Sequence, residues 1–243
     1  GKMRPIRRRF WSLLLTAAMI LALLPFGTPD AKAAAESTDT ALDTELVTNG
    51  GAETGTISGW TDDTGQGRWS SSGVYSSWAL PAAGSKYFFL YNPSMDTSMT
   101  GTMSQAAALS GTEGSGLFAA ISAGNVSMRF SVSMFQGIAA DNEAKAVVEE
   151  YTAGGALLKT SQAANTTASG TAMGSYQINT QLSPGARRLK VRLSATLTKG
   201  GYAQFDQVSL KLVSASAGSA PAFGSDFPAA AETDAGKPYT AGF

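Results

Sequence analysis

The chain has 243 residues, enough for one large domain or two small ones. Its 18 basic and 18 acidic residues cancel, so no net charge attracts nucleic acid or an anionic membrane surface. Cysteine and histidine are both absent, which excludes thiol nucleophiles, histidine bases, Ser-His-Asp triads, disulfide bonds and ordinary zinc sites.

Residues 3–35 have the pattern of a secretory signal peptide. Met3 opens a basic region, the apolar run "WSLLLTAAMILALLPF" follows, and the small residues "AKAAA" come next. Cleavage after Ala33 or Ala35 fits the small-x-small rule. The alternative is an N-terminal membrane anchor, but the apolar run is short of the ~20 residues that span a bilayer. We therefore expect a secreted, extracellular or cell-surface protein with no stable membrane span after cleavage.

Residues 43–213 consist of short segments with the alternation of β-strands. The clearest is "VSMRFSVSMF", in which apolar and polar residues take turns. Such a period of two places one set against a core and the other toward water. The set predicted to face the core is Val126, Met128, Phe130, Val132 and Met134.

Two later segments repeat this alternation. "LKVRLSATL" (189–197) places leucine, valine and alanine inward and Lys190, Arg192 and Ser194 outward. "FDQVSLKL" (205–212) also alternates, but its register shifts between Phe205 and Val208. The shift predicts a bulge or bend at 206–207.

The whole pattern predicts an all-β fold. Turn signals "AGG", "SPG" and "KGG" separate the segments, and none of them shows a helical stripe. Eight or nine short antiparallel strands over 43–213 predict a β-sandwich of the jelly-roll type. The other predicted strands are 44–48, 69–72, 86–91, 101–109, 144–151 and 176–182.

The C-terminal stretch differs in composition. Residues 214–225 are rich in Ala, Ser, Gly and Pro, as in an exposed linker. Residues 226–243 resemble the opening strand of another β domain, which cannot pair alone and so predicts that the natural protein continues past Phe243. The alternative is a disordered tail.

Four motifs in this order resemble the galactose-binding-like jelly rolls, especially the carbohydrate-binding modules of bacterial polysaccharide hydrolases. The motifs are "LVTNGGAETGTISGW", "GSKYFFLYN", "MSQAAALS" and "FDQVSLKL", and they cover residues 46–212. The resemblance supports the fold more strongly than the function, because this fold also serves adhesion and spacing.

The resemblance implies a structural calcium ion where the first and last strands meet. The matching carboxylates are Glu53 and Asp206, with backbone carbonyls near Gly51 as further ligands. Ca²⁺ binds six to eight hard oxygens, which two carboxylates and loop carbonyls can supply. The alternative makes Glu53 a solvated turn residue and Asp206 a buried hydrogen-bond acceptor.

Aromatic residues are the candidate sugar contacts, because a pyranose face packs on a ring while polar groups fix its hydroxyls. The segment "GRWSSSGVYSSWALP" offers Trp69, Tyr75 and Trp78 among serines. The alternative is that one or two of these rings fold inward as part of a small satellite core. Trp60 matches the family's glycine-tryptophan position, where the indole packs in the core.

No catalytic set is evident. Glu149 and Glu150 are adjacent on a predicted strand, so their side chains point to opposite faces and cannot act on one bond. One of them points toward the core, for which the sequence offers no reason. Asp62 and Asp63 lie in a turn-like segment, and no nucleophile-elbow or phosphate-binding glycine motif is present.

We therefore expect a non-catalytic carbohydrate-binding module that tethers a larger protein to a polysaccharide or cell-surface glycan. It would be a monomeric module in that larger chain and would not bind nucleic acid. The alternative is a structural or adhesive β-module of a multidomain bacterial surface protein that binds no sugar.

Overall fold

The computed structural model describes residues 38–65, 68–72, 79–137, 141–165 and 172–215, and the account below concerns these residues alone. The predicted signal peptide, almost all of the predicted linker and the predicted C-terminal strand lie outside them. Within the described part of the chain, no helix is long and apolar enough to cross a membrane.

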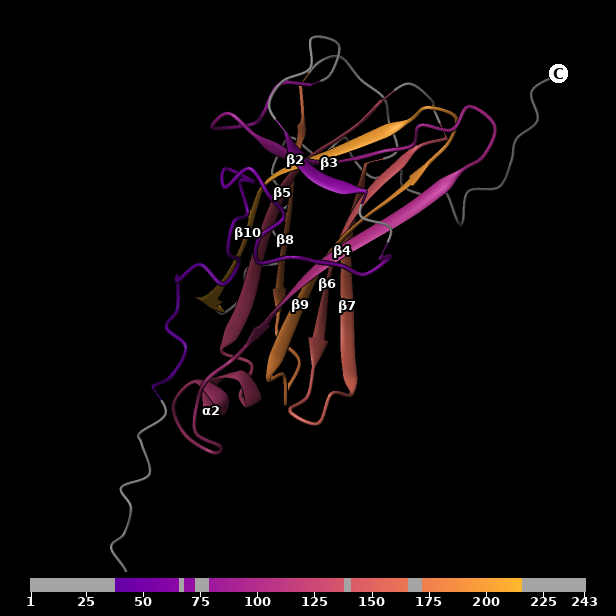
Figure 1. The fold of residues 1–243 in the computed structure, drawn as a ribbon. Helices are drawn as coiled ribbons and strands as arrows, with labels where there is room; N and C mark the ends of the chain where they lie inside the picture. Colours follow the sequence, from indigo (N-terminus) through magenta and orange to yellow (C-terminus); the bar gives the residue numbers. More distant parts are fainter. Residues whose placement is uncertain (1–37, 66–67, 73–78, 138–140, 166–171, 216–243) are drawn as a thin grey trace, which may run out of the picture. The chain divides into compact units, whose positions relative to one another are not determined.

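The described residues form two five-stranded antiparallel sheets that pack face to face (Figure 1). The first, called the β9 sheet after its central strand, has the order β1 (Thr61–Asp62), β4 (Met99–Ala108), β9 (Arg188–Leu197), β6 (Glu143–Tyr151) and β7 (Leu157–Asn165). The second, the β10 sheet, has the order β2 (Trp69–Ser72), β3 (Tyr87–Tyr91), β10 (Tyr202–Ser214), β5 (Val126–Gly137) and β8 (Gly174–Gln181). The predicted all-β sandwich is confirmed.

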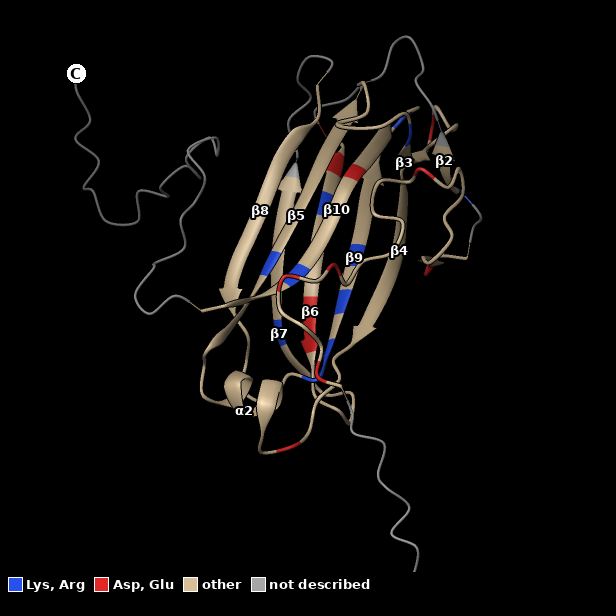
Figure 2. Cartoon of the chain, turned by 90° about the vertical axis from the view of Figure 1, so that its left-hand side faces the viewer, with Lys and Arg blue, Asp and Glu red and all other residues tan. Residues whose placement is uncertain are grey.

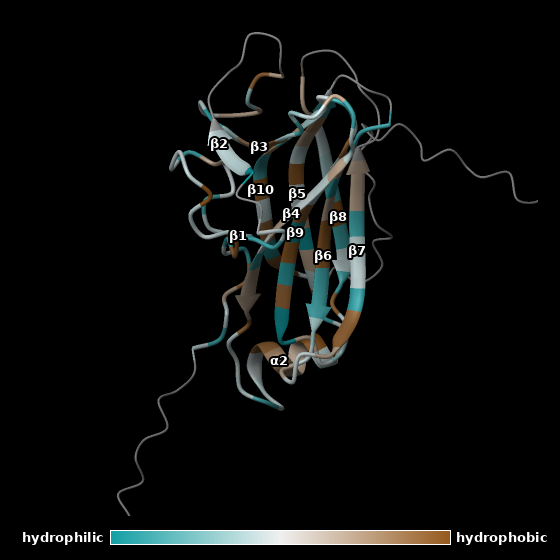
Figure 3. Ribbon diagram, turned by 45° about the vertical axis from the view of Figure 1, so that its right-hand side comes forward, coloured by the Kyte–Doolittle hydropathy of each residue, from teal (hydrophilic) through white to brown (hydrophobic). Residues whose placement is uncertain are grey.

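The core lies between the sheets and is made of the residues that alternation assigned to it. Every apolar residue predicted to face inward from β5 and β9 is buried, and Arg129 on β5 is exposed. Bands of opposite hydropathy follow one another along the strands in Figure 3. Trp60 is also buried, as predicted, with its ring 5.6 Å from that of Phe88.

The predicted irregularity in the last strand is a β-bulge. The pairing of β10 with β5 shifts register between Asp206 and Ser209, and Gln207 has a φ of 50°. The Val208 amide donates to the carbonyl of Gly50 at 3.0 Å, so the bulge fastens the N-terminal turn to β10. This contact places the Gly51 turn beside Asp206.

The predicted strand at 44–48 is only an isolated bridge between Glu45 and Lys211. Amide groups of Asp43 and Leu46 do donate to β10 carbonyls, so the segment runs along that strand. The Glu45 carboxylate, however, accepts from the Leu210 amide at 2.8 Å. The Leu210 amide is thus bound by a side chain and is not available to a backbone carbonyl of a regular strand pair.

Three elements were not predicted from the sequence: β1, β7 and α2 (Gly116–Ser122). The helix lies at one end of the sandwich (Figure 1) and buries Leu117, Phe118 and Ile121. Seven residues are too few to show a helical period clearly. Strand β7 is an edge strand, which can carry polar residues and exposed leucines without disturbing the core.

Candidate functional site

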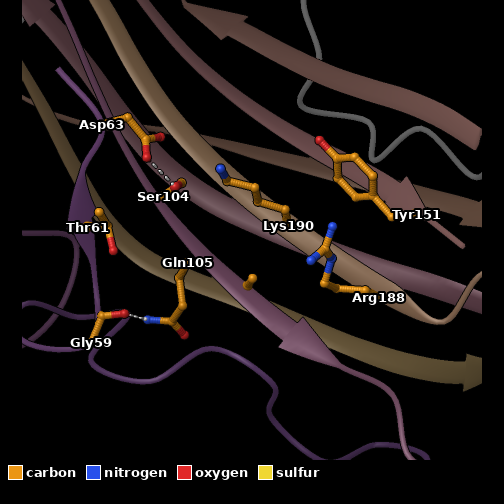
Figure 4. Close-up of a pocket in the computed structure, with 9 residues that line it drawn as sticks. Gly59, Thr61, Asp63, Ser104, Gln105, Tyr151, Arg188 and Lys190 are labelled. Atoms are coloured by element: carbon orange, nitrogen blue, oxygen red, sulfur yellow. Dashed lines mark hydrogen bonds between the residues drawn. The ribbon is translucent and has the colours of Figure 1, made fainter. Parts of the chain in front are cut away.

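An open groove of about 390 Å³ lies on the outer face of the β9 sheet (Figure 4). It crosses four neighbouring strands. The residues in and next to β1 form one wall, β4 and β9 form the floor, and β6 forms the opposite wall. The residues that line it are Gly59, Thr61, Asp63, Ser104, Gln105, Ala106, Tyr151, Arg188 and Lys190.

The hollow follows from side-chain size along one row of the sheet. Ala106 on β4 is opposite Lys190 on β9, which is opposite Glu149 on β6. Residues paired across strands share a face of the sheet. Small side chains at Ala106 and Ser104 therefore leave room between Lys190 and the β1 wall.

The wall formed by the β1 side is fixed by one glutamine. Gln105 accepts a hydrogen bond from the Thr48 amide at 2.7 Å and donates to the Gly59 carbonyl at 2.7 Å. Gly59 has a φ of 86°, and a Cβ there would lie 2.5 Å from Thr48 Oγ1. The close approach requires glycine, so the wall is held rigidly against the sheet.

Arg192, next to the groove, joins the two acidic side chains nearest to it, Asp63 and Glu149. Its guanidinium nitrogens lie 3.4 Å from Asp63 Oδ2 and 3.0 Å from Glu149 Oε2. Asp63 also accepts from Ser104 Oγ at 3.0 Å, and Tyr151 donates its hydroxyl to Glu149 Oε2 at 2.7 Å. The network orients both carboxylates before any ligand arrives.

The pKa of Glu149 is lowered by this network. Partial burial alone would raise the pKa, but hydrogen bonds from Tyr151 and Arg192 favour the charged carboxylate and outweigh it. Glu149 is therefore ionised at neutral pH and acts as an acceptor.

The groove also holds two cationic side chains. Arg188 lies over the ring of Tyr151, 4.9 Å from its centroid, in a cation–π contact. Neither Arg188 nor Lys190 is in an ion pair with any carboxylate of the described residues. Basic bands on β9 are visible in Figure 2.

A second hollow, of about 280 Å³, shares Arg188 with the groove and continues toward α2. Arg187 lies beside it, donating two hydrogen bonds to Glu113 at 2.6 and 2.7 Å. The same guanidinium lies 4.0 Å from the ring centroid of Phe118. Arg187 thus anchors α2, while Arg188 lines both hollows.

The structure corrects the prediction that Trp69 contacts sugar. Trp69 is only 5% exposed and belongs to the main core, with its ring 5.6 Å from that of Phe205. It begins β2, where it is directed inward, but into the main core and not into the small satellite core of the alternative. A buried indole offers no face to a sugar.

Tyr75 and Trp78 lie outside the described residues, so their predicted sugar contacts stay predictions. The described chain resumes at Ala79, whose backbone is held by Gln204 through two hydrogen bonds of 3.2 Å. Gln204 is fully buried on β10. Ala79 is therefore attached to the β10 sheet.

The structure brings Glu53 and Asp206 to the same turn, as the resemblance implied. A Cβ on Gly51 would lie 3.8 Å from Glu53 Cγ and 3.9 Å from Asp206 Oδ1. Both carboxylates bind one loop, residues 82–86. Asp206 accepts from the amides of Ala82 (2.8 Å) and Ala83 (3.1 Å).

Glu53 accepts from the Ser85 amide (2.8 Å), the Ser85 hydroxyl (3.0 Å) and the Lys86 amide (2.9 Å). These hydrogen bonds lower the pKa of Glu53, with the Ser85 amide having the largest effect. Burial raises the pKa of Asp206, although its amide donors oppose the shift. We call this arrangement of Glu53, Asp206 and residues 82–86 the carboxylate clasp.

The clasp does not have the form of a calcium cage. Its carboxylate oxygens face N–H and O–H donors, whereas Ca²⁺ requires six to eight oxygen ligands directed at one point. The described residues contain no group of three or more acidic side chains that could hold a metal ion. Asp206 is the buried hydrogen-bond acceptor of the alternative interpretation, and calcium stays a prediction from the resemblance.

Glu150 is the inward-facing glutamate that the sequence left unexplained. It is fully buried, accepts from the Ser183 amide at 2.7 Å and lies 3.7 Å from Lys159 Nζ. Lys159 also donates to Thr180 and to the Gln181 carbonyl. Glu150 and Lys159 therefore join the two sheets at the β7–β8 edge and are structural.

Sequence reasoning missed the groove residues Tyr151, Arg188 and Lys190. The alternation of "LKVRLSATL" did assign Lys190 and Arg192 to the solvent face. It could not show that Tyr151, from another strand, stands beside Arg188. That relationship depends on the pairing of β6 with β9.

No family model and no curated protein sequence matches the chain. Among solved structures it is similar to the carbohydrate-binding module TmCBM61 in complex with β-1,4-galactotriose, at 16% identity, with 71% of this chain and 99% of that chain covered and a TM-score of 0.48. It is also similar to a family 16 carbohydrate-binding module (15% identity, 68% and 98% covered, TM-score 0.48). A third is the tandem CBM22 domain of Paenibacillus barcinonensis Xyn10C (17% identity, 74% and 49% covered, TM-score 0.45).

Proposed function

We propose that the protein is a secreted, non-catalytic carbohydrate-binding module that tethers a larger protein to a polysaccharide. We further propose that it binds sugar in the groove on the outer face of the β9 sheet. The observation that carries the proposal is the groove itself, open, preformed and lined by polar groups on a rigid sheet.

The chemistry of the lining suits sugar hydroxyls. Such hydroxyls both donate and accept, so a site for them needs charged and polar groups of both kinds in fixed positions. Asp63 supplies carboxylate acceptors, and Lys190 and Arg188 supply donors. The ring of Tyr151 supplies apolar surface at the wall, where the edge or face of a pyranose can pack.

Binding without catalysis fits the state of the two acidic side chains beside the groove. A glycoside hydrolase needs one carboxyl group that holds a proton for the leaving group. Glu149 has a lowered pKa, which favours the ionised acceptor over a proton donor. Arg192 holds this carboxylate and that of Asp63 in fixed positions, where they can orient a ligand.

Affinity electrophoresis of the full chain on a panel of neutral and acidic polysaccharides tests the proposal. We expect retardation on at least one polysaccharide, and we expect Tyr151→Ala to abolish most of it. Tyr91→Ala is the matched control, because Tyr91 is an exposed tyrosine on the other sheet. Free mobility on every polysaccharide would refute a sugar-binding function.

A further inference from the structure

We propose that the groove selects acidic polysaccharides, with Arg188 and Lys190 binding the carboxylate of a uronic acid unit. This inference rests on the proposed sugar-binding function and names the ligand class within it. It follows from how the charges of this face are distributed among their partners.

The charged side chains in and next to the groove do not cancel. Arg192 contacts both carboxylates, Asp63 and Glu149, and with Arg188 and Lys190 the three cations exceed the two carboxylates by one positive charge. Arg188 and Lys190 are not in an ion pair with any described carboxylate. Lys190 still attracts Glu149, its cross-strand neighbour, so Arg188 is the cation that a neutral sugar leaves without an anionic partner among the described residues, whereas a uronate supplies one.

The two cations are also placed to act together. They are two residues apart on β9 and face the same side of the sheet, so their Cα atoms are about 7 Å apart. Both side chains are long enough to converge on one carboxylate. In Figure 4 the Arg188 guanidinium lies next to the Tyr151 ring, whereas the Lys190 amino group points toward Asp63, so Lys190 must change rotamer to meet a carboxylate held by Arg188.

Arg188 is oriented before binding. The Tyr151 ring on one side restricts the guanidinium, which reduces the entropy lost when a ligand binds. Guanidinium groups bind carboxylates through two parallel hydrogen bonds, so a fixed Arg188 favours a planar anion over a hydroxyl.

Nucleic acid is the other polyanion that two cations could attract. The chain has equal numbers of basic and acidic residues, which gives no field to attract a long phosphate backbone. The shape of the groove, with a tyrosine wall and a serine and alanine floor, suits a sugar ring. The observations therefore favour an acidic polysaccharide.

Ligands that differ only in charge distinguish the effect of the uronate carboxylate on binding from that of the shape of the sugar. Polygalacturonate, alginate and hyaluronan are each compared with their methyl-esterified forms, together with neutral galactan and xylan, at one pH and one salt concentration. We expect the full chain to bind at least one uronate polymer about fivefold more tightly than its ester, the range for one or two charge-assisted contacts at a partly exposed site. High salt should reduce this preference.

Charge-removing variants locate the effect. Arg188→Gln and Lys190→Gln should each lower the affinity for the free acid, so that it approaches the affinity for the ester. Arg129→Gln and Lys211→Gln are the controls, because these residues lie on the β10 sheet away from the groove. The controls should keep the full preference.

The outcomes distinguish this inference from the function on which it rests. Binding to neutral polymers or esters as tight as binding to the free acids overturns the inference and leaves sugar binding standing. Absence of binding to all polysaccharides overturns both. A DNA oligonucleotide bound as tightly as any uronate, and lost in the same two variants, also overturns the inference.

Discussion

Glu53 and Asp206 are far apart in the sequence, yet their carboxylates accept hydrogen bonds from the same loop, residues 82–86. Asp206 binds the amides of Ala82 and Ala83, and Glu53 binds those of Ser85 and Lys86. The same two carboxylates lie beside Gly51, at the junction of the N-terminal turn and β10. The clasp therefore connects the first and last parts of the sandwich with the loop that leads into β3.

The clasp allows a direct test of calcium. Its hydrogen bonds need no ion, so we expect EDTA to leave the melting temperature unchanged in differential scanning fluorimetry. A fall in melting temperature that Ca²⁺ reverses and Mg²⁺ does not would instead establish the calcium site predicted from the resemblance, because a bound ion stabilises only the folded state.

Removal of the Asp206 carboxylate should be costly. Asp206→Ala removes the buried carboxylate that accepts from the Ala82, Ala83 and Gln207 amides, and a hydrogen bond to a charged group contributes about 1.5–3 kcal/mol. We expect a lower free energy of unfolding in urea and faster hydrogen exchange of the Ala82 and Ala83 amides. Asp96→Ala, at an exposed position, is the control.

The pH dependence of stability should reveal Glu53. Its folded-state pKa is lowered below the ordinary value of 4.5, so its contribution is present above pH 4.5 and is lost as the pH falls through the folded-state pKa. We expect Glu53→Gln to lose less stability than the wild type between pH 5 and pH 3. Equal losses in the two proteins would contradict the clasp.

Gly101 has a role in packing that a single methyl group can test. A Cβ at this position would lie 2.5 Å from Leu90 Cδ2 and 3.3 Å from Trp69 Nε1. Gly101→Ala therefore overpacks the core between the sheets, at about 1–3 kcal/mol of unfolding free energy. Gly154→Ala is the matched control, because the nearest atom to its Cβ would be 3.9 Å away. A Gly101→Ala protein as stable as this control would contradict the packing.

Substitutions at Trp69 and Tyr151 should affect different properties of the protein, its stability and its affinity for polysaccharide. Trp69→Phe should lower the melting temperature, because the ring packs on Phe205, and should leave the affinity of the folded protein for polysaccharide unchanged. Tyr151→Ala should do the reverse, since Tyr151 lies at the surface of the groove. Calorimetric titration and thermal melts of both variants measure the two effects. A Trp69→Phe variant that loses affinity while keeping its melting temperature would return Trp69 to the binding site.

The sequence alone determined the elements that follow from a local period. Alternation of side chains identified β5, β9 and β10 with their core faces, and a break in that alternation identified the bulge at Gln207. These features could be predicted because a strand directs successive side chains to opposite faces whatever its neighbours are. The sequence also predicted that one of the adjacent glutamates faces inward, which Glu150 does.

Only the tertiary structure decided where the groove lies and which aromatic rings are free to bind. The position of Tyr151 beside Arg188 depends on the register between β6 and β9, and the two acids joined by Arg192 come from segments distant in the sequence. Trp69 is core because β2 pairs with β3 and turns its ring toward Phe205. Strand order and register are set by long-range packing, which a local pattern of apolar and polar residues does not encode.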